Sequence, residues 1–129
     1  YLDEVRKQAV HLPFKTTVSV NVTDMAERMC QADLSIGASG STSWERCCMG
    51  LPSITVILAE NQRSIAEALS KYKACLLVDT SRVTEELSRL IEIYARDAEE
   101  RLLLTQNAAQ ICDGGGAKRI ASAFKGEIA

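Results

Sequence analysis

Apolar residues recur along the chain with two periods, one typical of helices and one typical of strands. Helical spacing occurs in residues 2–12, 44–50, 61–72 and 81–97. Short β-branched or continuously apolar runs, which favour strands, occur at 16–22, 32–38, 53–59 and 74–79. Alternation of short strands with helices predicts an α/β fold, with a parallel sheet of about four strands and right-handed crossovers.

Glycine and proline mark the limits of these elements. Pro13 ends the first helix, because proline disfavours helical geometry in the residue before it. Gly50 and Pro52 end the helix over 44–50, and the strand at 53–59 that follows has no polar side, so we expect it at the centre of the sheet. Residues 114–116 are all glycine and suit a sharp turn between two helices. The layered arrangement is Rossmann-like, with helices flanking the sheet and a helical C-terminus.

The composition indicates which class of protein this is and which partners are not expected. The 129 residues are 47% hydrophobic and 25% charged, which is ordinary for one compact domain. A formal net charge of -2, with no run of lysine or arginine, makes nucleic acid an unexpected partner. The chain has no long apolar stretch, and acidic residues stand near its start, so we expect no signal peptide, no membrane segment and a cytoplasmic location.

The cysteines and the single histidine predict neither a metal site nor a cofactor. The five cysteines lack metal-site spacing and lie mostly in apolar segments, so we interpret them as reduced core thiols, with a disulfide or a zinc site as the minor alternative. His11 stands at the end of the first helix, away from the residues discussed next, and is not a catalytic candidate.

The loop at residues 37–42 is the candidate binding segment. It follows an apolar strand and precedes a helix, a position where free N–H groups and the helix dipole attract phosphate. Glu45 follows about one helical turn later, where its carboxylate could accept hydrogen bonds from ribose hydroxyls. Together they indicate a nucleotide. The loop residues in question are Gly37, Gly40, Ser41 and Thr42.

A structural interpretation of the same residues competes with this one. The loop could be a plain strand-to-helix turn in which Ser41 or Thr42 caps the helix and the glycines only permit tight packing. Glu45 could be a solvated or capping carboxylate, and Trp44 a core or interface aromatic. Spacing alone favours this structural interpretation, because loops rich in glycine and serine are common.

A family resemblance favours the nucleotide. Residues 32–69, ADLSIGASGSTSWERCCMGLPSITVILAENQRSIAEAL, and residues 112–124, CDGGGAKRIASAF, resemble the signature of UDP-2,4-diacetamido-2,4,6-trideoxy-β-L-altropyranose hydrolases of pseudaminic acid biosynthesis. The order of loop, glutamate, Gly-Leu-Pro and Asn-Gln is more distantly similar to the C-terminal domain of GT-B glycosyltransferases such as the lipid II N-acetylglucosaminyltransferase.

The resemblance implies a role for three groups of residues. Gly40, Ser41 and Thr42 would hold the UDP diphosphate, and Glu45 the ribose. Residues 60–62 match positions near the sugar and the diphosphate, although Asn61 would also serve as a helix cap. These three residues are Glu60, Asn61 and Gln62. The segment expected at the uracil comprises Val20, Asn21, Val22 and Met25.

The resemblance also implies a domain organisation. Members of the family carry a Gly-rich loop and a water-activating histidine on an N-terminal domain. Residues 1–129 are therefore expected to be a single nucleotide-sugar-binding domain, the C-terminal half of a two-domain enzyme, with no catalytic residue of its own and no activity alone. A family sheet of about six strands would be reduced here to about four. Its exposed edge would favour pairing with another chain, including a homodimer.

Three functions follow from these expectations. The first is a hydrolase that releases UDP from UDP-2,4-diacetamido-2,4,6-trideoxy-β-L-altropyranose or a related UDP-sugar. The second is a UDP-sugar glycosyltransferase domain of GT-B type, which passes the sugar to an acceptor. The third is a non-catalytic module that binds a nucleotide sugar or a partner protein. The run at residues 44–48, WERCC, favours the hydrolase.

Overall fold

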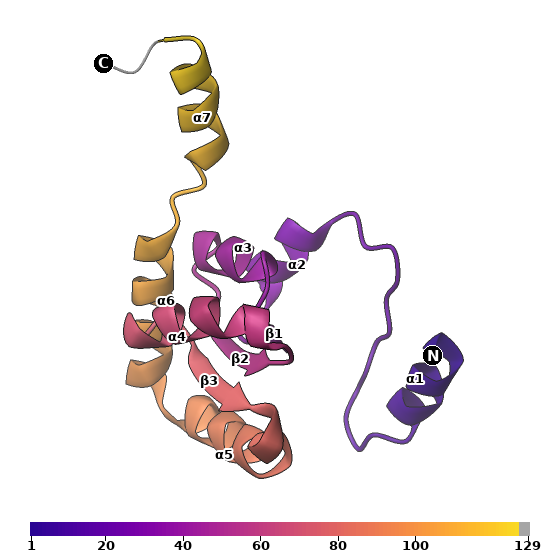
Figure 1. Cartoon of the computed structure of the whole chain (residues 1–129). Helices are drawn as coiled ribbons and strands as arrows, with labels where there is room; N and C mark the ends of the chain where they lie inside the picture. Colours follow the sequence, from indigo (N-terminus) through magenta and orange to yellow (C-terminus); the bar gives the residue numbers. More distant parts are fainter. Residues whose placement is uncertain (127–129) are drawn as a thin grey trace.

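A computed structural model describes residues 1–126, and its centre is a three-stranded parallel sheet (Figure 1). The strands lie in the order β1-β2-β3. Their bounds are β1 (Ser35–Ala38), β2 (Ser53–Ile57) and β3 (Leu76–Asp79). Ile54 of β2 lies opposite Ile36 of β1 and Leu76 of β3. The α/β class and the parallel sheet are thus confirmed.

Helices separate the strands and form the C-terminal part of the chain. The α-helices of the described residues are α1 (Leu2–Val10), α2 (Met25–Gln31), α3 (Thr42–Cys48), α4 (Arg63–Lys71), α5 (Val83–Arg96), α6 (Ala98–Ile111) and α7 (Gly116–Phe124). Two short 3-10 helices, η1 (Glu60–Gln62) and η2 (Thr80–Arg82), precede α4 and α5. The predicted helices all form, and the predicted turn at 114–116 has Gly114 at φ +70°.

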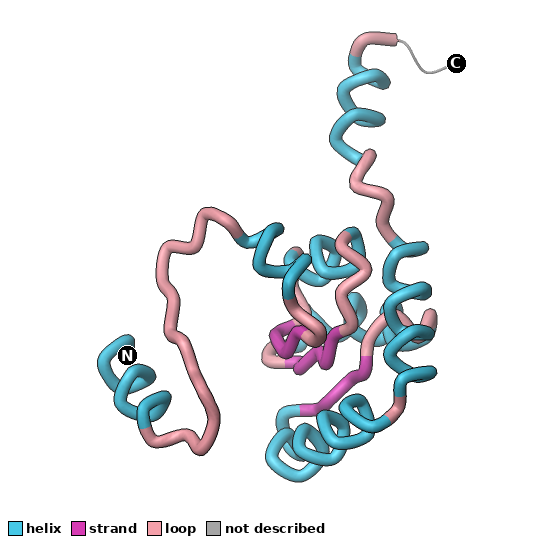
Figure 2. Tube along the Cα trace, turned by 180° about the vertical axis from the view of Figure 1, so that it is seen from behind, coloured by secondary structure: helices cyan, strands magenta, loops and turns pink. Residues whose placement is uncertain are grey.

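The strand expected at residues 16–22 does not form. Residues 15–20 have no secondary structure and pair with no strand, and Figure 2 shows this segment as part of a long loop between α1 and α2. β-branched side chains favour an extended backbone, but a strand also needs a neighbour that takes up its hydrogen bonds. In the described chain β1 pairs only with β2, so the segment stays in solvent, with Val20 53% exposed. The sheet has three strands rather than four.

β2 is the central strand, as predicted from its lack of a polar side. All five of its residues are buried, and it pairs with a strand on each side. Helices α4 and α5 pack against β2 and β3, while α6 packs against α3 and α5. The main apolar cluster lies between these helices and contains Cys47, Leu69, Ala74, Cys75 and Ala108.

The cysteines are all free, but only some of them lie in the core. Cys47 and Cys75 are buried and Cys112 is half-buried, whereas Cys30 and Cys48 are exposed. The expectation of core thiols is therefore wrong for Cys30 and Cys48. Both are exposed on their helices, and an apolar sequence context does not determine which face of a helix is buried.

The two terminal helices stand apart from the sheet. Neither α1 nor α7 contains a buried residue, and in Figure 1 both lie away from the body of the domain. Within the described residues, no helix has both the length and the apolar character needed to cross a bilayer.

Candidate functional site

The loop that follows β1 lies at the carboxyl end of the sheet. The Ser39 N–H donates to the Val56 carbonyl at 3.2 Å, which extends the pairing of β1 with β2 by one step. Ser39 is completely buried, so the chain turns outward only at Gly40. The next residues, Ser41 and Thr42, are exposed and lead directly into α3. The loop is thereby fixed at the edge where ligands of open α/β sheets bind.

Two N–H groups of this loop are free. Gly40 donates to the Ala38 carbonyl, Ser43 to the Gly40 carbonyl and Trp44 to the Ser41 carbonyl. Within residues 1–126 the N–H groups of Ser41 and Thr42 have no such partner. The Ser41 hydroxyl makes no capping hydrogen bond to α3, so it does not satisfy the helix start by itself. Two exposed donors at a helix start can bind an anion.

The two glycines of the loop have different surroundings. A Cβ atom added to Gly37 would stand 2.6 Å from Nη1 of Arg46, so the absence of a side chain at Gly37 is what admits the guanidinium. A Cβ added to Gly40 would meet no atom within 4 Å. Gly40 is therefore open toward solvent, whereas Gly37 packs against the interior of the domain.

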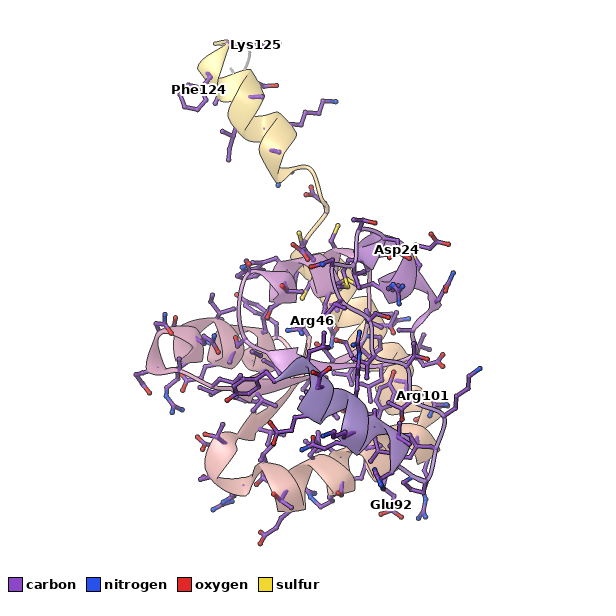
Figure 3. The ribbon with its side chains drawn as sticks, turned by 90° about the vertical axis from the view of Figure 1, so that its right-hand side faces the viewer. Asp24, Arg46, Glu92, Arg101, Phe124 and Lys125 are labelled. Atoms are coloured by element: carbon purple, nitrogen blue, oxygen red, sulfur yellow. The ribbon has the colours of Figure 1, made fainter. Side chains whose placement is uncertain are left out.

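Arg46 is the functional candidate that the sequence interpretation omits. It is 4% exposed, and its Nη2 donates to the Ala38 carbonyl at 3.0 Å and to the Ser43 hydroxyl at 2.9 Å. Burial lowers the pKa of the guanidinium. Ser43, Arg46 and Cys47 are the buried residues of α3 and recur at helical spacing, so a helical projection of 42–48 would place Arg46 on the inner face. Figure 3 shows Arg46 within the body of the domain.

Glu45 points away from the interior and lines a pocket of about 200 Å³ between α3 and α2. Met25, Met29 and Cys48 also line this pocket, so the structure brings Glu45 next to Met25 of the segment expected at the uracil. Within the described residues the Glu45 carboxylate has no hydrogen bond and no ion pair. It is available to a ligand.

The other residues expected at the uracil lie before α2. Val20 and Asn21 are exposed and Val22 is half-buried. Asn21 has φ 53°, a left-handed conformation that asparagine tolerates better than most residues. These three residues do not line the pocket that contains Glu45 and Met25.

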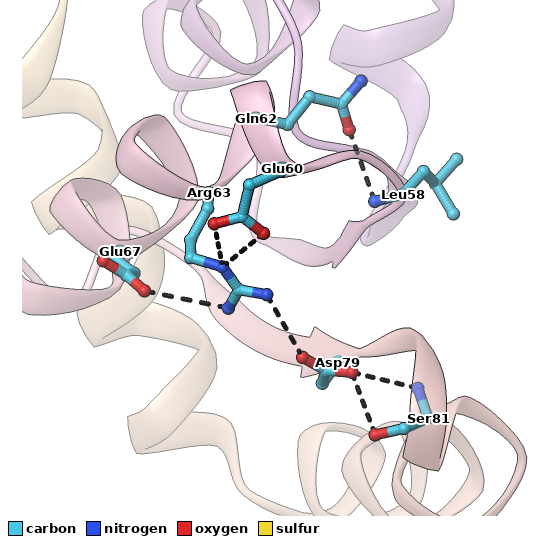
Figure 4. A network of polar contacts seen from close by, with 7 residues as sticks. All are labelled: Leu58, Glu60, Gln62, Arg63, Glu67, Asp79 and Ser81. Atoms are coloured by element: carbon cyan, nitrogen blue, oxygen red, sulfur yellow. Dashed lines mark hydrogen bonds and ion pairs between the residues drawn. The ribbon is translucent and has the colours of Figure 1, made fainter.

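Residues 60–62 follow β2 and form η1, at the same edge of the sheet as the loop after β1. Figure 4 shows their contacts: the single Nε–H of Arg63 is shared between the two carboxylate oxygens of Glu60, at 3.0 and 3.1 Å, and Oε1 of Gln62 accepts a hydrogen bond from the Leu58 N–H at 3.4 Å. Arg63 also lies 3.7 Å from Asp79. Asn61 is exposed and has no such partner among the described residues, nor does it cap α4. Among the described residues, the whole side-chain amide of Asn61 is free, whereas Gln62 is engaged through its oxygen only.

The two loops are neighbours because of the register of the sheet. Ala38 at the end of β1 lies opposite Val56, one residue before the end of β2. The loop with Ser41 and Thr42 and the turn with Asn61 therefore leave the sheet side by side.

Asp79 stands at the end of the third strand, β3. Hydrogen bonds from Ser81 are the main cause that lowers the pKa of its carboxyl group.

Other chemistry-bearing residues are not gathered at this edge. Nδ1 of His11 lies 2.7 Å from the Lys7 carbonyl oxygen at the exposed end of α1. Within residues 1–126, no three histidine, cysteine or acidic side chains come together as metal ligands.

Comparison with known proteins gives two matches. The family model described as "Glycosyltransferase family 28 C-terminal domain" matches residues 2–123. The chain is also similar to the spore coat polysaccharide biosynthesis protein SpsG of Bacillus subtilis (strain 168), with 30% identity over 103 residues. The aligned region covers 75% of this chain but only 29% of that relative, so the chain spans less than a third of the relative's length.

Proposed function

Because the chain belongs to the glycosyltransferase family 28 C-terminal domain family, we propose that residues 1–129 are the nucleotide-sugar-binding half of a two-domain enzyme that binds UDP. The observation that carries this proposal is the position of Glu45. Glu45 lies about one turn into α3, directly after a loop with two free N–H groups. Its unpaired carboxylate faces a pocket between α3 and α2. Phosphate and ribose are the two groups that such an arrangement can bind at once.

The diphosphate is assigned to the loop before α3. The N–H groups of Ser41 and Thr42 donate to phosphate oxygens, and the positive end of the short helix adds to the attraction. Gly40 has open space around its Cα, so a phosphate can approach the backbone closely there.

The nucleoside is assigned to the pocket between α3 and α2. The Glu45 carboxylate accepts hydrogen bonds from the two ribose hydroxyls, and the side chain of Met25 provides an apolar contact beside it. Val22, three residues before Met25, is assigned to the base on the family resemblance alone, because it does not line this pocket.

The sugar is assigned to the turn after β2. Asn61 has the free side chain of this turn and supplies the direct hydrogen bonds. Glu60 and Gln62 hold the turn in shape through Arg63 and the Leu58 N–H, and the exposed carboxylate of Glu60 and the amide nitrogen of Gln62 can still contact the ligand.

The reaction proposed first is hydrolysis of a UDP-sugar such as UDP-2,4-diacetamido-2,4,6-trideoxy-β-L-altropyranose. Water attacks the anomeric carbon, the bond between that carbon and the diphosphate oxygen breaks, and UDP leaves. The domain described here stabilises the charge that develops on the leaving diphosphate. The group that activates water belongs to the partner domain. The run at residues 44–48, WERCC, supports the hydrolase.

Glycosyl transfer is the second candidate, and the matched family supports it directly. The binding half would be the same, but an acceptor hydroxyl would replace water. The two reactions differ in a simple way, because free sugar appears without an acceptor only in hydrolysis. Analysis of the products formed by the full-length enzyme, with and without an acceptor, distinguishes them.

Titration of this domain with UDP, with CMP and ADP as controls, tests the nucleotide assignment. Calorimetry should detect binding selective for UDP, and Glu45→Ala should weaken it by about 1–3 kcal/mol through loss of hydrogen bonds to a charged acceptor. Glu92→Ala, at an exposed position of α5, is the matched control and should bind as the unmodified protein does. Equal affinity for all three nucleotides, or an unaffected Glu45→Ala variant, would contradict the assignment. UDP binding by a full-length protein without turnover would indicate a non-catalytic module.

A further inference from the structure

Two cysteines from different helices are in contact where α3 and α6 end. Cys48 is the last residue of α3 and is exposed, whereas Cys112 directly follows α6 and is half-buried. The thiols of Cys48 and Cys112 share a side-chain hydrogen bond. The two residues are far apart in the sequence, so the packing of α3 against α6 is what brings them together.

The residues around the pair place the two thiols in the same way. A Cβ added to Gly114 would stand 3.0 Å from Sγ of Cys48, and a Cβ added to Gly50 would stand 3.6 Å from Cβ of Ala109. The end of α3 therefore lies along the end of α6. Cys112 stands between Ala109 and Gly114 in the sequence, within the segment that Cys48 contacts.

The surroundings of the pair favour thiol chemistry over metal binding. Within residues 1–126, no set of three histidine, cysteine or acidic side chains is arranged to hold a metal ion. Desolvation and then the neighbouring Cys112 thiol raise the pKa of the Cys48 thiol, so the pair is protonated at neutral pH. Thiolate is the reactive form, and a dissolved oxidant reaches it at the exposed Cys48.

The link between α6 and α7, residues 112–115, connects the position of Cys112 to α7. Oδ1 of Asp113 accepts a hydrogen bond from the Gly115 N–H at 2.9 Å, and Oδ2 accepts one from Nη1 of Arg119 at 2.7 Å. Arg119 lies in the first turn of α7, which Figure 1 shows continuing from α6 through this link. A bond that holds Cys112 against α3 therefore also holds the adjacent Asp113, to which the first turn of α7 is attached.

We propose that Cys48 and Cys112 form a reversible disulfide that fastens the link between α6 and α7 to α3. The oxidant is a low-molecular-weight disulfide such as oxidised glutathione. The Cys48 thiolate attacks one sulfur of the oxidant, whose S–S bond breaks, and one glutathione leaves. The Cys112 thiolate then attacks the Cys48 sulfur, and the second glutathione leaves as the protein disulfide forms. The two protons of the protein thiols end on the two glutathione molecules, which take up the two electrons.

The pair borders the pocket of Glu45, because Cys48 lines that pocket as well. Formation of the disulfide requires only the contact between α3 and α6, and neither UDP nor the Glu45 carboxylate takes part in it. The proposal therefore goes beyond the proposed function and does not rest on it.

Oxidation of the full chain by oxidised glutathione tests the proposal. The measurement uses Cys30→Ser, because Cys30 is the other exposed thiol and would itself react with the oxidant. After incubation at about pH 8, where thiolate forms more readily, the reaction is quenched with acid and analysed by intact mass and peptide mapping. We expect a protein that is lighter by two hydrogens, one linked peptide joining Cys48 to Cys112, and full reversal by dithiothreitol.

Two further measurements report whether the bond fastens the link. The midpoint of urea denaturation should rise by about 1–2 M on oxidation, because a disulfide between distant residues lowers the entropy of the unfolded chain. Hydrogen exchange of the amides of residues 113–115 should slow at least about threefold, because local opening of the link becomes less favourable.

The matched control is the double variant Cys30→Ser/Cys112→Ser. It should stop at the first step and retain one glutathione on Cys48, with no rise in the urea midpoint and no slower exchange at residues 113–115. If this variant does not fold, peptide mapping of Cys30→Ser still decides, because it identifies the bonded cysteines directly.

Four outcomes would overturn the proposal. They are a lasting mixed disulfide on Cys48 beside a free Cys112, a disulfide that involves Cys47 or Cys75, a covalent dimer, and a Cys48–Cys112 bond that changes neither the urea midpoint nor the exchange of the link. The first three would show that the two thiols do not react with each other, and the fourth that their bond does not fasten the link. A negative UDP titration affects none of these measurements, so failure of the nucleotide assignment and failure of the disulfide are distinguishable.

Discussion

The guanidinium of Arg46 occupies the space that a side chain at Gly37 would need. Nη1 would lie 2.6 Å from a Cβ at that position, and the same guanidinium is held through Nη2 by Ala38 and Ser43. Arg46 is thus held by hydrogen bonds at Nη2, while Nη1 fills the space beside Gly37. The contact links the end of β1 to α3 and helps to hold the loop between them in place.

Substitution of Gly37 by alanine should destabilise the fold. Arg46 is buried and hydrogen-bonded, so it cannot move aside freely, and we expect a loss of about 1–3 kcal/mol in the free energy of unfolding. Urea denaturation measures the effect. Gly40→Ala is the control and should change stability by less than about 0.5 kcal/mol, because no atom lies near its Cβ. In the double variant Gly37→Ala/Arg46→Met, the cost of the alanine should fall, and full additivity would show that the contact does not matter.

The stability of the protein should decrease at alkaline pH through Cys47. Burial raises the pKa of this thiol from an ordinary value of 9.0 to about 11. The folded state therefore holds the proton more tightly, and its advantage is complete below pH 9 and lost as the pH rises to 11. The free energy of unfolding should fall by about 1.4 kcal/mol per pH unit in this window.

The variant Cys47→Ala isolates this effect. It should be less stable at neutral pH because a buried side chain is lost, but its stability should decline less steeply above pH 9. The variant keeps every other ionisable side chain, so the difference between the two slopes reports Cys47. Parallel slopes would show that the thiol has an ordinary pKa in the folded state.

Removal of the Tyr94 hydroxyl should weaken the attachment of α5 to the start of β1. The hydroxyl donates to the Asp33 carbonyl across 61 residues of sequence, and Tyr94 is 4% exposed. We expect Tyr94→Phe to cost about 1 kcal/mol, or more if the carbonyl stays without a partner. Chemical denaturation is the measurement. Tyr72→Phe, at a position that is 64% exposed, should have no effect, and equal losses in the two variants would refute the interpretation.

Substitution of Asn61, in the turn after β2, should weaken sugar binding without a matching loss of UDP binding. Asn61→Ala should weaken binding of a UDP-sugar about three- to tenfold but leave UDP binding nearly unchanged, since a neutral hydrogen bond contributes about 0.5–1.5 kcal/mol. Competition binding with both ligands measures this. Glu60→Gln should have little effect on either ligand, because Glu60 pairs with Arg63. A larger loss in Glu60→Gln than in Asn61→Ala would place Glu60, not Asn61, against the sugar.

Local sequence was sufficient for much of the fold. The apolar run at 53–59 predicted a central buried strand, and β2 is central and fully buried. The alternation of strands and helices predicted the α/β class and placed the loop before α3 at the carboxyl end of β1. These features depend on periodicity and on glycine and proline, which act within a few residues, so they are readable from the sequence.

The place of the loop and of Glu45 in the fold could also be predicted, but the contacts of these residues could not. Ser41, Thr42 and Glu45 could be singled out by their spacing and by a family resemblance. Whether a carboxylate is free depends on what stands opposite it in space. Glu45 is unpaired, whereas Glu60, a similar residue in the sequence, is held by Arg63.

The sequence by itself determined which segments are helical or extended, and the tertiary structure decided which of them find partners. Residues 16–22 have the composition of a strand but pair with nothing, because strand formation requires hydrogen bonds from a neighbour that sequence composition does not provide. Arg46 is charged and yet buried, because α3 packs against α6 and the guanidinium is hydrogen-bonded to Ala38 and Ser43. Whether a strand is paired and whether a side chain is buried depend on groups that are distant in the sequence. These groups meet only in the folded chain, so the tertiary structure decides both.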